Sequence, residues 1–224
     1  MQKLRILNMD LKNTNNIFRC MRKMGKVDYR TSEISSWIED QDDFSIIMLQ
    51  GEDAQKVGLR LEKSLGLDFY AADDSPSAIL VRNGIPHYCI AALGDADELG
   101  NCVVLSLGGE FLSLFSVMLT DSKDINKLSN VFKKYINPAT QSFTRYQIVG
   151  GVFPSLGSVD TVSGNHHLMD ITSEDNDVSK KKNQFVNTIL LSPEIGYSDV
   201  RRDDTLVKQK VLKNSPITTT VFYK

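Results

Sequence analysis

Phe44-Ser45-Ile46-Ile47-Met48-Leu49 is an apolar run that leads directly into Gln50-Gly51-Glu52. A nearly uninterrupted apolar run of this length predicts a strand that is covered on both faces. The segment behind it, residues 52–65, repeats apolar residues every four positions and is followed by Gly66. That pattern predicts an amphipathic helix with a glycine stop. A buried strand that is followed at once by such a helix indicates an α/β fold.

The rest of the chain extends this pattern in both directions. The predicted strands are 4–7, 44–49, 69–71, 77–82, 87–92, 101–107, 111–119, 146–149, 185–191, 204–212 and 217–223. The predicted helices are 13–24, 33–38 (capped by Thr31 or Ser32), 52–65 and 125–136. Because two strand-rich halves each come with helices, we expect a four-layer α/β sandwich. It would have two mixed β-sheets packed face to face with helices outside, in a single domain over residues 1–224.

Charge and cysteine content restrict the classes of function. The chain has 26 Lys and Arg against 28 Asp and Glu, so it lacks the basic surplus of a dedicated non-specific nucleic-acid binder. Cys20, Cys89 and Cys102 show no CxxC spacing and are expected to be free thiols in a reducing compartment. No apolar stretch approaches the ~18 residues of a membrane span. We therefore expect an intracellular protein, cytoplasmic or nuclear, without a membrane partner.

Several strand ends carry a further pattern. The opening strand ends at Asp10, and Ile46 to Gly51 reads Ile-Ile-Met-Leu-Gln-Gly. Near the end of the chain, Lys213-Asn214-Ser215-Pro216-Ile217 precedes the last strand. These segments resemble the endonuclease/exonuclease/phosphatase superfamily, which has the DNase I-like fold, and the resemblance covers nearly the whole chain. It implies a two-sheet sandwich with a Mg²⁺-dependent phosphoesterase site at one edge.

The resemblance also implies that the functional positions have been exchanged. The exchanged residues are Asp10 for asparagine, Gly51 for glutamate, Asp121 for histidine, Gly151 and Phe153 for the aspartate and asparagine of Gly-Asp-x-Asn, Asn187 for aspartate, and Lys213 and Asn214 for Asp-His. Glycine offers Mg²⁺ no ligand and cannot act as a base, and Lys213 would repel the cation. We therefore predict no catalytic residue, no cofactor and no enzymatic activity.

An active protein would need relocated ligands. One residue of slippage would put Glu52 at the position of the family's glutamate, so Asp10 and Glu52 are the candidate Mg²⁺ ligands in that case. The structural alternative is that Glu52 and Asp53 occupy the first turn of the following helix, where acids complement the helix dipole.

Other polar residues are given structural interpretations. His166-His167 is expected to be a polar pair on a loop or strand, whose side chains point opposite ways. Ser155 lacks the Gly-x-Ser-x-Gly elbow of a serine hydrolase. The basic clusters Lys180-Lys181-Lys182 and Arg201-Arg202 lie beside acids. They predict either a charge-balanced loop or a phosphate-binding patch.

These observations favour a pseudoenzyme that serves as a scaffold or regulatory subunit by binding a protein partner. The loop 173–183 and the former active-site edge are the expected binding regions, because glycine and phenylalanine would make that edge less polar. Non-cleaving nucleic-acid binding is one alternative. A divalent-metal-dependent phosphodiesterase with relocated ligands is the other.

Overall fold

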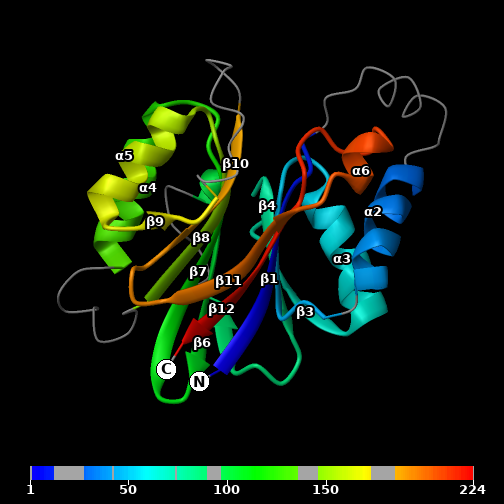
Figure 1. Ribbon diagram of the computed structural model, residues 1–224, viewed down its shortest axis with the longest axis horizontal. Coiled ribbons are helices and arrows are strands. Elements are labelled where there is room, and N and C mark those ends of the chain that lie inside the picture. Colours follow the sequence, from blue (N-terminus) through cyan, green and yellow to red (C-terminus); the bar gives the residue numbers. More distant parts are fainter. Residues whose placement is uncertain are drawn as a thin grey trace.

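Two six-stranded β-sheets form the body of the molecule (Figure 1). The computed structural model describes residues 2–12, 28–41, 43–73, 75–89, 97–135, 146–172 and 185–223. The first sheet, sheet A, has the strand order β11-β12-β1-β2-β4-β3. The second, sheet B, has the order β5-β6-β7-β8-β10-β9. Both sheets are mixed, since β1 runs parallel to β2 and β7 runs parallel to β8, while the other pairs are antiparallel.

The strands of each sheet come from both halves of the chain. Sheet A contains β1 (Gln2–Asp10), β2 (Ile46–Gln50), β3 (Leu67–Tyr70), β4 (Ser77–Arg82), β11 (Gly196–Arg202) and β12 (Ile217–Tyr223). Sheet B contains β5 (His87–Cys89), β6 (Gly100–Leu107), β7 (Glu110–Met118), β8 (Tyr146–Phe153), β9 (Met169–Asp170) and β10 (Val186–Leu191). The last strand, β12, lies beside the first, so the two ends of the chain meet in sheet A.

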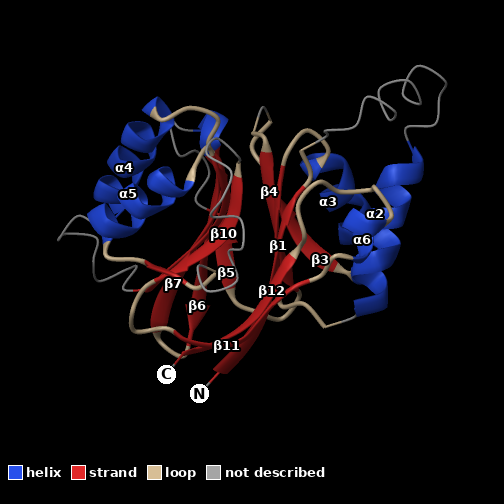
Figure 2. Ribbon diagram, turned by 45° about the horizontal axis from the view of Figure 1, so that its top comes forward, coloured by secondary structure: helices blue, strands red, loops and turns tan. Residues whose placement is uncertain are grey.

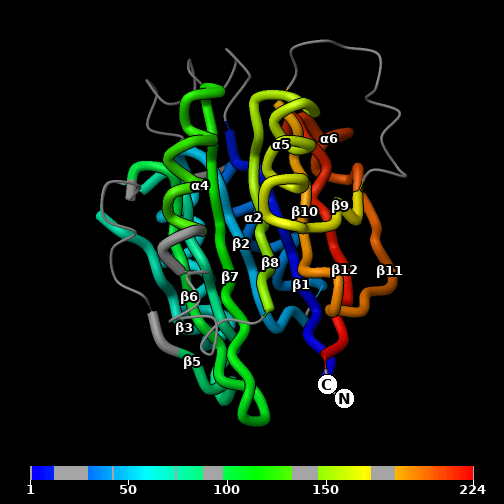
Figure 3. Tube along the Cα trace, turned by 90° about the vertical axis from the view of Figure 1, so that its left-hand side faces the viewer, coloured from blue at the N-terminus to red at the C-terminus, as the bar shows by residue number. Residues whose placement is uncertain are grey.

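Helices cover the outer side of each sheet (Figures 2 and 3). On the side of sheet A lie α2 (Asp28–Gln41), α3 (Ala54–Leu65) and the short α6 (Thr205–Lys208). On the side of sheet B lie α4 (Lys123–Tyr135) and α5 (Leu156–His166), and a 3₁₀ turn (Asp97–Leu99) precedes β6. The predicted four-layer α/β sandwich is therefore confirmed. Among the described helices, none is long and apolar enough to cross a membrane.

Alternation along the strands builds the core. On β1, Leu4 and Ile6 point toward sheet B and belong to the cluster between the sheets, whereas Leu7 and Met9 pack under the helices. A third cluster joins sheet B to α4 and α5. Because both faces of the central strands are buried, their sequences read as continuous apolar runs.

The structure corrects several predicted elements. Residues 204–212 form α6 and turns instead of a strand, and the strand β11 was not predicted. Helix α2 begins at Asp28, so Thr31 and Ser32 lie inside it and do not cap it. The predicted helix over 13–24 lies outside the described residues.

Helix α5 was also not predicted, because its glycines and β-branched residues are weak helix formers. Ser155 caps this helix: its hydroxyl accepts a hydrogen bond from Ser158 N at 3.2 Å. The prediction that His166 and His167 lie on a loop or strand is wrong, since His166 ends the helix and His167 is its left-handed cap. Nε2 of His166 lies 3.0 Å from Oγ of Ser129 on α4, which indicates a contact between the two helices.

Candidate functional site

A buried amide network joins the two sheets close to the end of β1. Asn8 donates from Nδ2 to Oδ1 of Asn187 at 2.7 Å and to the carbonyl oxygen of Thr188 at 3.0 Å. Its own Oδ1 accepts from Nε2 of Gln50 at 2.8 Å, and Gln50 also donates to Oγ of Ser116 at 2.9 Å. All of these side chains are buried, so they fix β1 and β2 of sheet A against β7 and β10 of sheet B.

Asp10 is the next inward-facing residue of β1 and is 2% exposed. Its Oδ1 accepts a hydrogen bond from Lys12 N at 2.8 Å, and its Oδ2 accepts one from Asn214 Nδ2 at 2.6 Å. Burial raises the pKa of the Asp10 carboxyl above its ordinary value of 3.8, although these hydrogen bonds and the charges of Lys12 and Lys213 oppose the shift. The structure thus brings together two predicted site residues from opposite ends of the chain.

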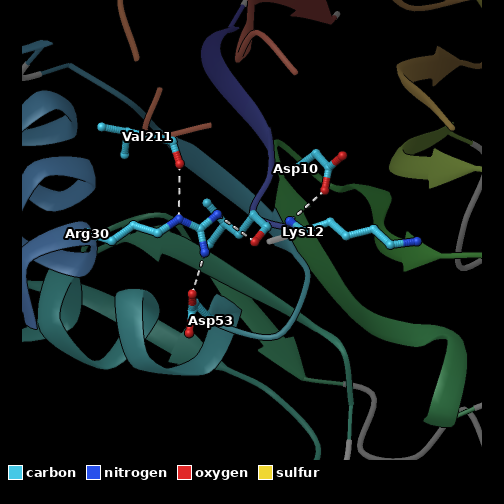
Figure 4. A network of polar contacts seen from close by, with 6 residues as sticks. Asp10, Lys12, Arg30, Asp53 and Val211 are labelled. Carbon is cyan, nitrogen blue, oxygen red and sulfur yellow. Dashed lines mark hydrogen bonds and ion pairs between the residues drawn. The ribbon is translucent and has the colours of Figure 1, made fainter. Parts of the chain in front are cut away.

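Lys12 places a cation at the same edge of the sandwich. Its Nζ lies 3.3 Å from the centre of the Phe185 ring, just ahead of β10, so the side chain reaches from sheet A to sheet B. Figure 4 shows it extending away from Asp10. Burial lowers the pKa of the Lys12 ammonium, and the negative charges of Asp10 and Glu52 partly restore it. We refer to Asp10, Lys12, Gly51, Glu52, Lys213 and Asn214 as the rim.

Gly51 occupies a backbone conformation that excludes a side chain. Its φ is +117°, and a Cβ atom there would lie 2.6 Å from Lys12 N and 2.7 Å from the carbonyl carbon of Leu11. No other residue can therefore stand at this position without moving the end of β1. The backbone of the rim therefore leaves no space for a side chain at residue 51.

Glu52 and Asp53 precede helix α3, which begins at Ala54. The expectation that they lie in its first turn is therefore wrong. Glu52 is exposed at the rim. Asp53 is 6% exposed and makes no side-chain cap; it forms an ion pair with Arg30.

Arg30 ties together the segments that carry the rim (Figure 4). From α2 it donates through Nη1 to Oδ2 of Asp53 at 2.5 Å, through Nη2 to the Leu11 carbonyl at 2.9 Å, and through Nε to the Val211 carbonyl at 3.0 Å. Each acceptor lies one or two residues from a rim residue: Leu11 from Lys12, Asp53 from Glu52, and Val211 from Lys213. A buried guanidinium with three acceptors fixes the relative positions of these segments.

Gly151 and Phe153 do not lie at the rim. In the β8–β10 pairing Val152 lies opposite Asn187, whose side chain points toward sheet A, so Val152 shares that face. Gly151 and Phe153 point the other way, and Phe153 is fully buried among the residues that pack under α4 and α5. The expectation that these two residues make the edge less polar is therefore wrong.

Asp121 lies in a local hydrogen-bonded turn just before α4. It is exposed before α4, and its Oδ1 accepts from Lys123 N at 3.0 Å and from Ser122 Oγ at 3.1 Å. These hydrogen bonds lower the pKa of the Asp121 carboxyl.

The basic pair on β11 does not form a joint patch. The Arg201 side chain is 76% exposed and lies 3.5 Å from Asp199, whereas Arg202 is half-buried and donates to the Asn187 carbonyl at 3.3 Å. Lys180, Lys181 and Lys182, and the loop 173–183 that contains them, lie outside the described residues. Cys102 is buried.

Sequence reasoning missed Asn8, Lys12 and Arg30. Asn8 could have been found, because it interrupts an otherwise apolar strand and alternates with Leu4, Ile6 and Asp10 on one face. Lys12 and Arg30 carry no comparable signal, since their partners are distant in the sequence.

The rim residues do not fit a Mg²⁺ ion. Both oxygens of Asp10 already accept hydrogen bonds, and the Lys12 charge interacts with both Asp10 and Glu52. Within the described ranges, no group of three His, Cys, Asp or Glu side chains is placed to hold a metal. Mg²⁺ is held by carboxylate oxygens together with water, and here both Asp10 oxygens accept hydrogen bonds within the rim.

Solved structures with the same architecture include endonuclease/exonuclease/phosphatase family proteins, an endonuclease domain and a phosphatase. A humanized TDP2 from D. rerio with 14 mutations matches with a TM-score of 0.65 and 16% identity over 99% of both chains. An endonuclease/exonuclease/phosphatase from Bacteroides vulgatus matches with a TM-score of 0.70 and 10% identity over 100% of both chains. The mannosyl-6-phosphatase Bt3783 of Bacteroides thetaiotaomicron matches with a TM-score of 0.66 and 13% identity over 98% of this chain and 100% of that one.

No family model and no curated protein matches the sequence. The chain has the DNase I-like fold of the endonuclease/exonuclease/phosphatase superfamily, as the strand ends predicted. At these identities the likeness establishes the fold, and the activity depends on the residues at the rim.

Gly51→Ala should lower the free energy of unfolding by about 3 kcal/mol or more, because it combines backbone strain with a clash against Leu11 and Lys12. Gly84→Ala is the matched control: φ is +90° there and no atom would contact the new Cβ, so a loss of about 1 kcal/mol is expected. Urea denaturation measures both values. Equal losses in the two variants would show that Gly51 is not packed as described.

The stability of Asp10→Asn relative to the wild type should shift in favour of the variant as the pH rises. Because the folded-state pKa of Asp10 is raised, the native protein binds more protons than the unfolded chain between the ordinary pKa of 3.8 and the folded pKa. Wild-type stability should therefore fall as the pH rises through that window, and the variant should lack this decrease. The melting temperature as a function of pH measures the effect.

Asp121→Asn is the control with the opposite sign. The folded pKa of Asp121 is lowered, so its contribution is present above 3.8 and is lost as the pH falls through the folded pKa. Parallel pH profiles for the wild type and Asp10→Asn would contradict the assignment of a raised pKa to Asp10.

Proposed function

We propose that this chain is a non-hydrolytic protein on a DNase I-like scaffold that acts by binding a macromolecular partner, with the rim as a contact surface. A protein is the partner that the chain's composition favours, because its net charge of −2 disfavours general attraction to nucleic acid. A fold that keeps its core while its edge loses the groups needed for chemistry is most simply explained by a surface role.

The state of Asp10 is the observation that carries this proposal. It is the buried carboxylate of the rim, and hydrogen bonds from Lys12 N and Asn214 occupy its two oxygens. The charges of Asp10 and Glu52 act to raise the pKa of Lys12, and the charge of Lys12 acts to lower the pKa of Asp10. A positive charge this near the site opposes the binding of a metal cation.

The remaining rim groups support binding better than catalysis. Lys213 is exposed, Asn214 is half-buried, and Glu52 is exposed, so charged and amide groups are presented to solvent around a rigid base. The Arg30 hydrogen bonds hold the segments that carry them. Pre-organised polar groups on a rigid support lower the entropic cost of association.

The purified protein should show no turnover of bis(p-nitrophenyl) phosphate during titration with Mg²⁺ or Mn²⁺. The expected rate is that of buffer with the same metal, and Glu52→Gln should leave it unchanged. Metal-dependent turnover that disappears in Glu52→Gln or Asp10→Asn would instead support the phosphodiesterase alternative with relocated ligands.

Lys213→Glu should reduce capture of the partner from cell extract, because it reverses a charge at the exposed rim. Lys63→Glu makes the same exchange on the exposed side of α3 and should capture the partner as well as the wild type does. Quantitative mass spectrometry of the bound chains measures the difference. Equal capture by the two variants would exclude the rim as the contact surface, and nuclease-sensitive capture would favour nucleic acid as the partner.

A further inference from the structure

The outer face of sheet A is covered by helices over its centre but is open over β12. On β2 the outward residues Ile47 and Leu49 are fully buried in the cluster under α2 and α3. On β12 the outward residues Thr218, Thr220 and Phe222 are half-exposed. Figures 1 and 2 show α2, α3 and α6 grouped to one side of β11 and β12. In the described part of the chain, this portion of the sheet is therefore accessible.

Strand register places cations on both sides of the open strip. Lys3 and Arg5 of β1 lie opposite Phe222 and Thr220, and Arg201 of β11 lies opposite Thr218. Directly opposite residues point to the same face of a sheet, so the cations flank the β12 side chains. We call this set the outer basic face: Lys3, Arg5, Arg201, Thr218, Thr220 and Phe222.

Among the residues that the structure describes, no buried acid forms an ion pair with a cation of the outer basic face. The Arg201 side chain is 76% exposed, and its acidic neighbour Asp199, at 3.5 Å, is 60% exposed. Exposed pairs of this kind are weak and exchange readily with other partners. Lys3 is exposed, and Arg5 donates from Nη1 to the carbonyl of Gln41 at 3.4 Å. Lys3 and Arg201 therefore present exposed positive charges on either side of β12.

We propose that the outer basic face docks an extended acidic peptide segment of a partner protein. Alternate residues of a strand are spaced by about 6.6–6.8 Å. Carboxylates at every second position of an extended segment therefore match the spacing of Lys3 and Arg5 along β1. Arginine and lysine bind carboxylates, and the hydroxyls of Thr218 and Thr220 can donate between them. This goes beyond the function proposed for the rim, because it uses a different side of sheet A and none of the rim residues.

The aromatic rings of this region favour a peptide over single-stranded nucleic acid. Nζ of Lys3 lies 5.6 Å from the centre of the Phe222 ring, and the Arg5 guanidinium lies 4.8 Å from that of Phe44. Both rings already have a cation over them, whereas single-strand binding relies on open rings on which bases stack. Tyr197 lies opposite the inward-facing Val221, so it belongs to the other face.

The edge of sheet A is a poor alternative for the same partner. The β11–β12 register shifts between Ser198 and Arg201, and Asp199 there has φ of 55°. Such a bulge interrupts the regular row of backbone groups that an added strand needs. Docking across the face does not require that row.

The test measures the binding of labelled probes by fluorescence anisotropy at low salt. Two probes are peptides of about ten residues, one alternating glutamate with serine and the other alternating glutamine with serine. The third is an oligothymidylate of about ten nucleotides. The acidic peptide should bind and the glutamine peptide should not. Lys3→Gln/Arg201→Gln should raise the Kd of the acidic peptide between about twofold and thirtyfold, the range for two exposed ion pairs.

The matched control is Lys56→Gln/Lys63→Gln, which removes the same charge from exposed positions of α3 and should leave the Kd unchanged. All four substituted side chains are exposed, so the variants should fold like the wild type. The proposal fails if the acidic peptide does not bind, or if the control pair weakens binding as much. It also fails if oligothymidylate binds as tightly and responds to the Lys3 and Arg201 changes.

Discussion

The amide of Asn8 is the interaction on which the arrangement of the two sheets at the rim depends. It lies inside the sandwich, where its three hydrogen bonds reach Gln50 in its own sheet and Asn187 and Thr188 in the other. Buried amides that lose a partner cost about 1–3 kcal/mol each, so these hydrogen bonds oppose any sliding of one sheet over the other. Gly150 belongs to the same constraint, because a Cβ atom there would lie 2.5 Å from Oδ1 of Asn8.

This constraint determines what the neighbouring positions can do. Asp10 lies two residues beyond Asn8 on the same face of β1 and is drawn into the same buried layer, where Asn214 and Lys12 N use its oxygens. Arg30 then anchors the backbone just past Asp10. The close approach of that backbone to Gly51 leaves no space for a side chain. A rim built in this way is rigid and polar, but it offers few open ligands.

The fold and the rim therefore lead to different conclusions about function. The architecture is shared with nucleases and phosphatases, whereas the rim carries lysines and amides around one buried carboxylate. Function depends on the site and not on the scaffold, so the local chemistry has priority. The open face of β12 adds a second polar surface to the same sheet.

The sequence alone determined the elements that depend on local patterning. The apolar run before Gln50 and the helix that ends before Gly66 were both predictable, because hydrophobic periodicity and a glycine stop act over a few residues. The order of polar strand ends was sufficient to predict the DNase I-like fold.

Only the tertiary structure decided the details that depend on register and distant contacts. A shift of one residue along β8 separates Val152, which faces sheet A, from Gly151 and Phe153, which face the helices, and no local signal fixes that choice. The pairing of Asp10 with Asn214 and of Arg30 with Asp53 joins residues that lie far apart in the sequence. Helix α5 forms despite weak propensity, because its buried residues pack against sheet B. The physical reason is the same in each case: these features are stabilised by contacts that exist only after the chain has folded.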